Sequence, residues 1–306
     1  EDTRYVASSY TEGHSPKYVV DENTSTYWES QGNKDEWVSV FTGTDQYIKD
    51  MNILWGDQYA TEYDVYISQD GEDYQLISSV KDGKGKEETI NIGKICHYVK
   101  IVMKSAKDKR YQIKELTFNE GKLLSLNQPV TVSSVSTNAP TFVGSLAVDG
   151  DTSTRWASKR DSNDEWISID LGKESNMNAV VINWEAACSD NYQIEVSSDN
   201  KNWKTVKSSL KTDQTLTDEI NFDEAVTGRY IKVHSLKSRI VSGKNYGINI
   251  FEIKVYGTAS NIALNKPAKA RSEYSSSLSA KNAFDGSVEK TSSFQSRWAS
   301  DRKHND

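Results

Sequence analysis

A short segment rich in oxygen-bearing side chains offers the chemistry of a metal-binding turn. Asp149, Asp151 and Thr154 fall within residues 147–158, and Gly150 between the two aspartates permits a sharp bend. Calcium takes about six to eight oxygen ligands from carboxylates, hydroxyls and main-chain carbonyls, and such a loop can supply several of them. The same residues also suit a plain Asp-Gly turn capped by Thr and Ser. Chemistry alone leaves both alternatives open.

The segment is one of three related copies, which makes the chain a tandem repeat. The first copy, at residues 19–30, places Asp21, Asn23 and Thr26 where the second has Asp149, Asp151 and Thr154. The third copy has residues 283–287, then a polar insertion, then residues 296–300. We therefore predict two complete modules, at 1–120 and 126–257, and a truncated third at 261–306. The array is expected to continue beyond residue 306.

Composition excludes several classes of partner. The net charge is -7, and no block of lysine or arginine interrupts the acidic pattern. Binding to nucleic acid or to an anionic membrane surface needs a basic face, so neither is expected. No apolar run approaches the roughly 20 residues of a membrane span.

Short alternating segments dominate between these turns and predict an all-β fold. Residues 63–68 and 192–197 alternate with a period of two, and each is followed by a turn-forming pair. Matching segments follow at 97–101 and 229–233. The many aromatic residues, 8 Trp and 16 Tyr, suit dense cores in small β-sandwiches. Trp156, Trp166 and Trp203 are predicted to lie in the core.

The second module resembles the discoidin or coagulation-factor type C superfamily, and most of all carbohydrate-binding module family 32 of bacterial glycan-degrading enzymes. The resemblance rests on segments that occur in the family's order, at residues 147–156, 164–172, 183–187, 197–203, 228–233 and 251–257. It implies tandem jelly-roll sandwiches of the galactose-binding-like type. It also implies a structural calcium ion in each complete module, a glycan site in the loops at one end, and no catalysis by the module.

The resemblance adds one ligand from the last strand to each predicted metal loop. The calcium ligands are then Asp149, Asp151, Thr154 and Glu252 in module 2, and Asp21, Asn23, Thr26 and Glu115 in module 1. A metal surrounded by protein oxygens has no open position for a substrate, so its role is structural.

Sugar recognition needs an aromatic face together with fixed hydrogen-bonding groups. The candidates in module 2 are Trp184, Glu185, Lys159, Arg160, Arg239, Asn245 and Tyr246, and those in module 1 are Trp55, Arg110 and Tyr111. Two alternatives stay open, since Trp184 could equally belong to the core and Arg239 could pair with surface acids. Module 1 could bind another sugar, bind weakly, or act as a spacer.

The chain contains none of the catalytic motifs His-Glu-x-x-His, Gly-x-Ser-x-Gly or the P-loop. We therefore expect non-catalytic carbohydrate binding that targets an attached enzyme, a glycoside hydrolase in the same full-length polypeptide, to glycans. The alternative is an adhesin-type surface protein that binds host glycan or protein, and phospholipid binding ranks third. The expected location is outside a bacterial cell, secreted or on the cell surface.

Overall fold

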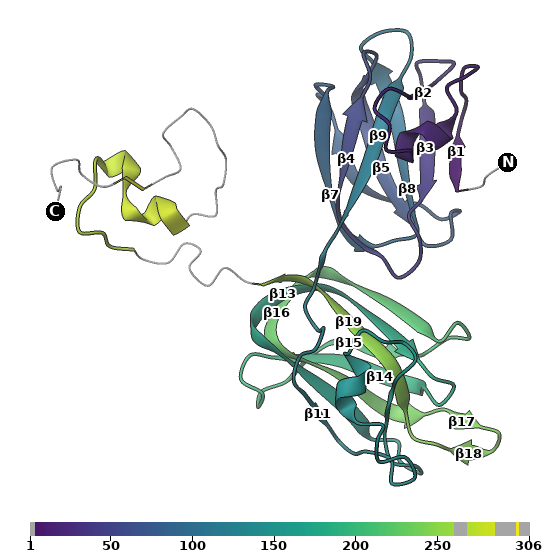
Figure 1. Ribbon diagram of the computed structural model, residues 1–306, viewed down its shortest axis with the longest axis vertical. Helices are drawn as coiled ribbons and strands as arrows, with labels where there is room; N and C mark the ends of the chain where they lie inside the picture. Colours follow the sequence, from purple (N-terminus) through teal and green to yellow (C-terminus); the bar gives the residue numbers. More distant parts are fainter. Residues whose placement is uncertain (1–3, 260–267, 285–297, 300–306) are drawn as a thin grey trace. The chain divides into compact units, whose positions relative to one another are not determined.

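The computed structural model describes residues 4–259, 268–284 and 298–299. Contacts along the chain divide it into two units, Glu1–Thr258 and Ala259–Asp306. The first unit contains two β-sandwiches built from antiparallel strands (Figure 1), which confirms the predicted all-β class. No helix in the described part of the chain is long and apolar enough to cross a membrane.

Module 1 consists of a five-stranded and a four-stranded sheet. The first has the order β1 (Tyr5–Ala7), β3 (Glu36–Phe41), β8 (Tyr98–Ala106), β5 (Ala60–Ser68) and β6 (Gln75–Val80). The second has the order β2 (Trp28–Glu29), β9 (Gln112–Glu120), β4 (Tyr47–Trp55) and β7 (Glu87–Ile95). Because alternate residues face inward, Val38, Ile53, Val65 and Ile101 are buried between the sheets.

Module 2 repeats this plan with longer strands. Its main sheet has the order β10 (Lys122–Leu123), β19 (Asn249–Ala259), β13 (Glu165–Trp184), β16 (Thr217–Ser238), β14 (Ser189–Ser197) and β15 (Lys204–Leu210). The strand β11 (Val130–Val132) joins β13, and β12 (Trp156–Ala157) joins β19. In β13 the pairing with β16 shifts register between Asp170 and Ser175. The single strand β13 therefore covers the positions that β3 and β4 occupy separately in module 1.

Short elements complete the described chain. The hairpin of β17 (Ile240–Val241) and β18 (Lys244–Asn245) precedes β19, and 3-10 turns occur at η1 (Pro16–Val20) and η2 (Gly144–Ala147). In the second unit, η3 (Ser276–Leu278) and η4 (Ala280–Phe284) are described. Most of the predicted third copy, residues 285–287, 296–297 and 300, lies outside the described residues.

The tryptophans predicted for the core divide into two groups. Trp156 is fully buried, as expected. Trp166 and Trp203 are only half-buried, and the ammonium group of Lys232 lies over their rings, 5.4 and 3.7 Å from the ring centroids. The core prediction is wrong for these two. Trp166 points outward because its neighbour Ile167 takes the inward face of β13, and Trp203 lies in the turn between β14 and β15.

Candidate functional site

The predicted metal loop of module 2 closes on itself through its own oxygen atoms. The Thr154 hydroxyl donates to Asp149 Oδ2 at 2.8 Å, and the amide of Asp151 donates to Asp149 Oδ1 at 3.0 Å. The Asp151 carboxylate is exposed and accepts hydrogen bonds from the hydroxyl and amide of Ser153. Gly150 adopts a left-handed φ of 81°, which a glycine reaches without strain.

Strand β19 places Glu252 beneath this loop. Its side chain is 1 % exposed, and Oε2 accepts the amide of Gly150 at 3.1 Å. The other oxygen, Oε1, has no hydrogen-bond partner among the described residues. Burial, together with the negative charges of Asp149 and Asp151, raises the pKa of Glu252 to about 7 from its ordinary 4.5.

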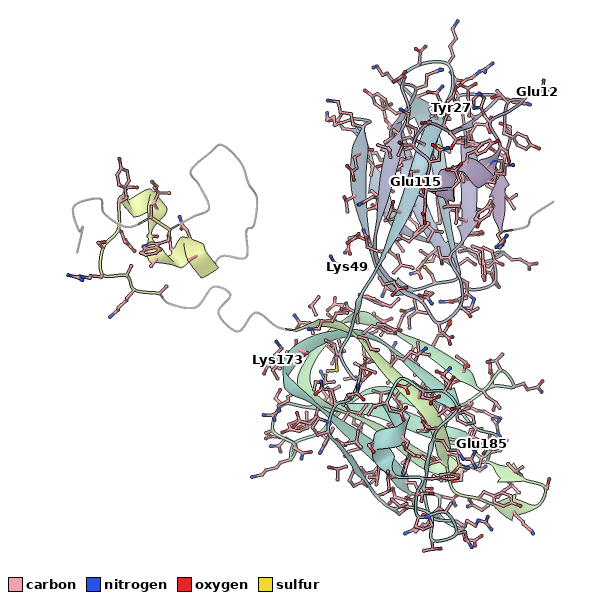
Figure 2. All side chains as sticks on the ribbon, viewed as in Figure 1. Glu12, Tyr27, Lys49, Glu115, Lys173 and Glu185 are labelled. Carbon is pink, nitrogen blue, oxygen red and sulfur yellow. The ribbon has the colours of Figure 1, made fainter. Side chains whose placement is uncertain are left out.

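Module 1 repeats this arrangement. The hydroxyl of Thr26 donates to Asp21 Oδ2 at 2.7 Å, and the amide of Asn23 donates to Asp21 Oδ1 at 3.0 Å. Glu115 on β9 (Figure 2) again carries a buried oxygen, Oε2, without a partner in the described chain. Burial and nearby acids raise its pKa. Glu22 stands where module 2 has Gly150 and adopts the same left-handed backbone, with φ of 58°.

The donor set fits a hard cation at both loops. Each site combines a carboxylate that has one buried oxygen without a partner in the described chain with aspartate, hydroxyl and carbonyl oxygens, which are the ligand types that calcium takes. In the described residues, however, no group of three or more His, Cys, Asp or Glu side chains is positioned to hold a metal. Carboxylates alone would therefore not complete the coordination, and hydroxyl or main-chain oxygens would have to contribute.

Four of the predicted sugar-binding residues lie together in two loops, one that follows β12 and one that precedes β19. The Arg160 guanidinium lies over the Tyr246 ring at 4.9 Å, and the Asn245 carbonyl accepts the amide of Asp161 at 3.1 Å. Lys159 precedes Arg160 in the same loop. The two loops can approach each other closely because position 247, which lies between them, is a glycine without a side chain. A Cβ at Gly247 would lie 2.3 Å from the Lys159 carbonyl oxygen.

Three residues predicted to contact a sugar lie in the core instead, which for Trp184 is the alternative that the sequence left open. Trp184 and Trp55 are each 2 % exposed, and Tyr111 is fully buried. The Trp184 indole donates to Asp218 Oδ2 at 2.7 Å, and the Trp55 indole donates to Glu88 Oε2 at 2.7 Å. Since their polar atoms already have partners inside the module, these side chains belong to the structural framework of the core and not to a binding surface.

Arg239 is paired within the protein, which is the alternative to sugar binding that the sequence left open. Its Nε donates to Asp190 Oδ1 at 2.9 Å, and its guanidinium also donates to the Thr212 carbonyl. These partners lie on or beside the β14–β15 hairpin. The structure shows no contact of Arg239 with Arg160 or Tyr246 within the described residues.

Glu185 lies at the end of β13 (Figure 2) and is held firmly. Its Oε2 accepts the Asn249 side-chain amide at 3.0 Å and the Ala187 backbone amide at 2.9 Å. Burial alone would raise the pKa of Glu185, but these bonds and the charge of Arg155 hold it below the usual value. Glu185 is therefore a fixed carboxylate at the loop end of the module.

Arg155 is a residue that sequence reasoning missed. Its guanidinium lies 4.5 Å from the ring centroid of Phe142 and 6.0 Å from that of Phe251. Arg155 Nε and Asn249 Oδ1 are both buried without hydrogen-bond partners among the described residues. The available signal was the difference between the copies, since module 1 has Tyr27 at this position. We call Phe142, Arg155, Glu185, Asn249 and Phe251 the Arg155 cluster.

Module 1 fills the corresponding region with an internal network. Glu29 accepts Arg110 Nη1 at 2.6 Å, Gln112 Nε2 at 2.7 Å and the Thr11 hydroxyl at 3.1 Å. Gly56 stands at the position of Glu185, and the Gln112 side chain occupies the space beside it. The candidate Arg110 is thus paired, and the described residues of module 1 contain no equivalent of the Arg155 cluster.

Comparison with known proteins gives one family and several partial relatives. The model of the F5/8 type C domain matches residues 5–116 and 129–252. A polysaccharide lyase 8 family protein, HylA of Enterococcus faecalis, is 37% identical over 67 residues, which are 22% of this chain and 5% of that protein. The chain thus spans only a small part of this curated relative.

Two solved structures each match a little under half of the chain. Chitosan-binding module 2 of a Paenibacillus sp. IK-5 chitosanase/glucanase, in complex with chitotriose, is 35% identical with a TM-score of 0.40, covering 44% of this chain and 99% of its own. CpGH89CBM32-5 of Clostridium perfringens, in complex with GalNAc-β-1,3-galactose, is 19% identical with a TM-score of 0.39, covering 44% and 100%.

The raised pKa of Glu252 predicts how stability depends on pH in a metal-free, chelator-treated sample. An acid whose pKa is higher in the folded state loses stability as pH rises from its unfolded value, 4.5, through its folded value, about 7. Glu252→Gln should remove about 3 kcal/mol of this loss between pH 4.5 and 8. Urea unfolding at both pH values measures it, with exposed Glu224→Gln as the control. An unchanged pH dependence in Glu252→Gln would contradict the prediction.

Trp184→Phe tests whether the indole belongs to the frame. The change keeps an aromatic ring but leaves Asp218 without one donor, which should lower the free energy of unfolding by about 2 kcal/mol. Trp203→Phe, on the outer face of the sheet, should change it by less than about 0.5 kcal/mol. Equal effects of the two substitutions in urea titrations would refute the assignment.

Proposed function

Because the chain belongs to the F5/8 type C domain family, we propose that it is a glycan-binding protein whose principal site is the Arg155 cluster of module 2. Domains of this family are binding modules, so these residues carry no catalysis of their own. The match to a polysaccharide lyase family protein supports a polysaccharide as the class of ligand.

The observation that carries the proposal is the unmet hydrogen-bonding capacity of the Arg155 cluster. Arg155 Nε is a donor and Asn249 Oδ1 is an acceptor, and neither has a partner in the described chain. Sugar hydroxyl groups both donate and accept, so a small side-chain movement on binding would let one sugar satisfy both groups. The rings of Phe142 and Phe251 offer apolar surface for the carbon-bound face of a pyranose.

The neighbouring loops would extend the site. Arg160, stacked on Tyr246, lies in the loop that follows β12, and β12 pairs with β19 beside Asn249. A second sugar unit leaving the Arg155 cluster would reach these side chains. At the corresponding end of module 1, Glu29 already accepts the hydrogen bonds of the neighbouring polar side chains. We therefore assign glycan binding to module 2 first.

We also infer that the chain serves a larger secreted bacterial protein with a polysaccharide-degrading catalytic domain. A module matching 5% of a polysaccharide lyase family protein is the kind of unit that such enzymes share. A glycoside hydrolase is an equally suitable host, and weak binding by several modules would add avidity on a polymer. The coding sequence on either side of these residues tests this inference directly.

A structural calcium ion in each complete module is the second part of the proposal. Glu252 Oε1 and Glu115 Oε2 are corresponding buried oxygens without a partner among the residues that the structure describes, and a bound cation in each module would neutralise its carboxylate. The residues that would hold it are Asp149, Asp151, Thr154 and Glu252 in module 2, and Asp21, Asn23, Thr26 and Glu115 in module 1.

Glycan binding is tested with an array of neutral, amino and acidic sugars, followed by calorimetry on the best oligosaccharide. Arg155→Ala and Glu185→Gln should each weaken binding at least about tenfold, since each removes a charged hydrogen-bonding group. Exposed Lys201→Ala should bind like the wild type. Unchanged affinity in Arg155→Ala would exclude this cluster, and a silent array with the wild type would exclude glycan binding.

Calcium binding is tested by thermal unfolding with chelator and with added calcium. Calcium that binds only the folded state should raise Tm by several degrees at millimolar concentration. Glu252→Gln and Glu115→Gln should each abolish part of this gain, while Glu224→Gln should keep all of it. A Tm that is the same with chelator and with calcium would overturn the proposal.

A further inference from the structure

Strand β13 of module 2 is buried on both of its faces, although one face points away from the core of module 2. In β13, Val180 and Ile182 belong to the module 2 core, as the two-residue period of a strand requires. Ala179 and Val181 point to the other side and are also fully buried. They form a separate apolar cluster with Tyr47 and Ile95 of module 1.

The equivalent face of module 1 is polar, which makes the apolar face specific to module 2. Aligning Ile53 with Ile182 places Asp50 and Asn52 where module 2 has Ala179 and Val181. A strand at this position therefore folds with a polar outer face. The apolar residues of β13 serve something other than the folding of module 2.

Aromatic stacking extends this cluster to the last strand. The rings of Tyr47 and Tyr256 are 5.4 Å apart and inclined by only 10°. Tyr47 is almost fully buried, and Tyr256 of β19 packs against the cluster. Burying these groups removes apolar surface of both modules from water and so favours their association.

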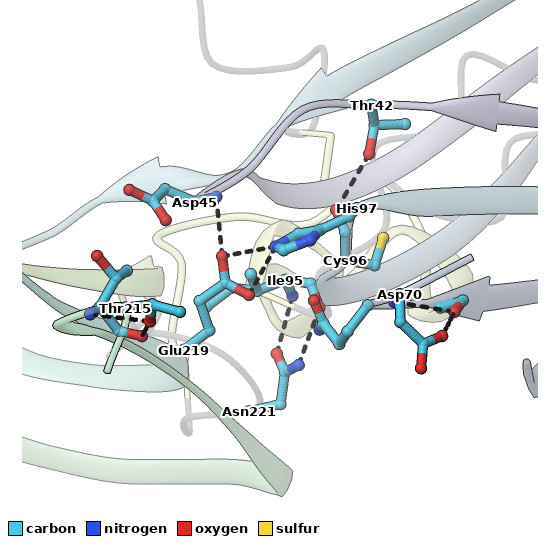
Figure 3. A network of polar contacts seen from close by, with 12 residues as sticks. Thr42, Asp45, Asp70, Ile95, Cys96, His97, Thr215, Glu219 and Asn221 are labelled. Carbon is cyan, nitrogen blue, oxygen red and sulfur yellow. Dashed lines mark hydrogen bonds and ion pairs between the residues drawn. The ribbon is translucent and has the colours of Figure 1, made fainter. Parts of the chain in front are cut away.

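Polar contacts also link the two modules beside Ile95 (Figure 3). The Asn221 side chain accepts the Ile95 amide at 2.8 Å and donates to the Ile95 carbonyl at 2.9 Å, so that it satisfies both main-chain groups of one residue. Lys94 donates its ammonium group to the Phe222 carbonyl at 2.7 Å. Separating the modules would expose all of these groups together.

A hydrogen-bonded contact between a histidine and a carboxylate completes the interface. His97 Nε2 lies 2.8 and 2.9 Å from the two oxygens of Glu219, and Glu219 Oε1 also accepts the amide of Asp45 at 2.9 Å. The side chains of His97 and Glu219 are 20% and 13% exposed, so water screens this contact only partly.

The connection between the modules is itself structured. Strand β10 pairs Lys122 with Gly257 and Leu123 with Tyr256 of β19. Just before it, the amide of Gly121 donates to the Tyr47 carbonyl at 3.0 Å, and a Cβ at Gly121 would lie 2.0 Å from the Tyr47 ring. A short tethered connection keeps the effective concentration of the two faces high.

We propose that module 1 is a permanent intramolecular partner of module 2, so that the two fold and unfold as one cooperative body. The partner surface on module 2 is the outer face of β13 with Glu219 and Asn221 of β16, and it fits the residues around Tyr47 and Ile95. This inference goes beyond glycan binding and does not depend on it.

The decisive variant transplants the polar face of module 1 onto module 2 in the full chain, as Ala179→Asp combined with Val181→Asn. Module 1 shows that these residues are compatible with the strand. The wild type should unfold in one calorimetric transition with equal calorimetric and van't Hoff enthalpies, and the variant should unfold in two. Leu76→Asn, at an exposed apolar position of β6, should keep the single transition. Two transitions in the wild type would overturn the proposal.

A second measurement stands even where the double variant fails to fold. Spin labels at Lys81→Cys and Lys173→Cys report on one module each, and the native Cys96 and Cys188 are buried and free. The wild type should give one narrow distance distribution, and hydrogen exchange at the Ile95 amide should quicken at least about tenfold in Asn221→Ala. A broad distance distribution in the wild type would show independent modules and overturn the proposal.

Discussion

Two neighbouring carboxylates at the start of β16 face opposite sides of their sheet, and much of the molecule is arranged around them. Asp218 points into module 2 and accepts the Trp184 indole and the Tyr192 hydroxyl, both at 2.7 Å. Glu219 points away from that core and accepts His97 of module 1. The two-residue period of one strand thus joins the centre of module 2 to its neighbour.

Module 1 has an inward-facing carboxylate with the same two kinds of partner. Glu88 Oε2 accepts the Trp55 indole at 2.7 Å and the Tyr63 hydroxyl at 2.9 Å, as Asp218 does for Trp184 and Tyr192. A carboxylate that is partly withdrawn from water needs hydrogen-bond donors in its place, and the tryptophan and tyrosine supply them. This explains why tryptophans at the ends of β4 and β13 are parts of the frame.

The sequence predicted what local patterns and repetition encode, namely the strands, the tandem repeat, the family and the position of the aspartate loops. It did not predict whether the tryptophan at the end of a strand points into the core or to the surface. The partner that holds Trp184 inside is Asp218, which lies 34 residues later in the chain. The pattern around Arg155 did not indicate its role, because Arg155 follows directly on the predicted metal ligands Asp149, Asp151 and Thr154. The apolar run at residues 179–182 did carry a signal, since a strand without polar alternation is buried on both faces.

The two modules share a framework and differ at the loop end and on the outer face of one sheet. At the loop end, module 2 has Glu185 and Arg155 with unmet hydrogen-bonding capacity nearby, whereas module 1 has Gly56 and a closed network around Glu29. On the outer face of the sheet, module 2 has Ala179 and Val181, whereas the equivalent positions of module 1 are polar. The docking residues of module 1 lie instead around Tyr47 and Ile95. A repeat that keeps its inward-facing carboxylate and changes only these surfaces can give one copy a binding end and the other a supporting role without altering the fold.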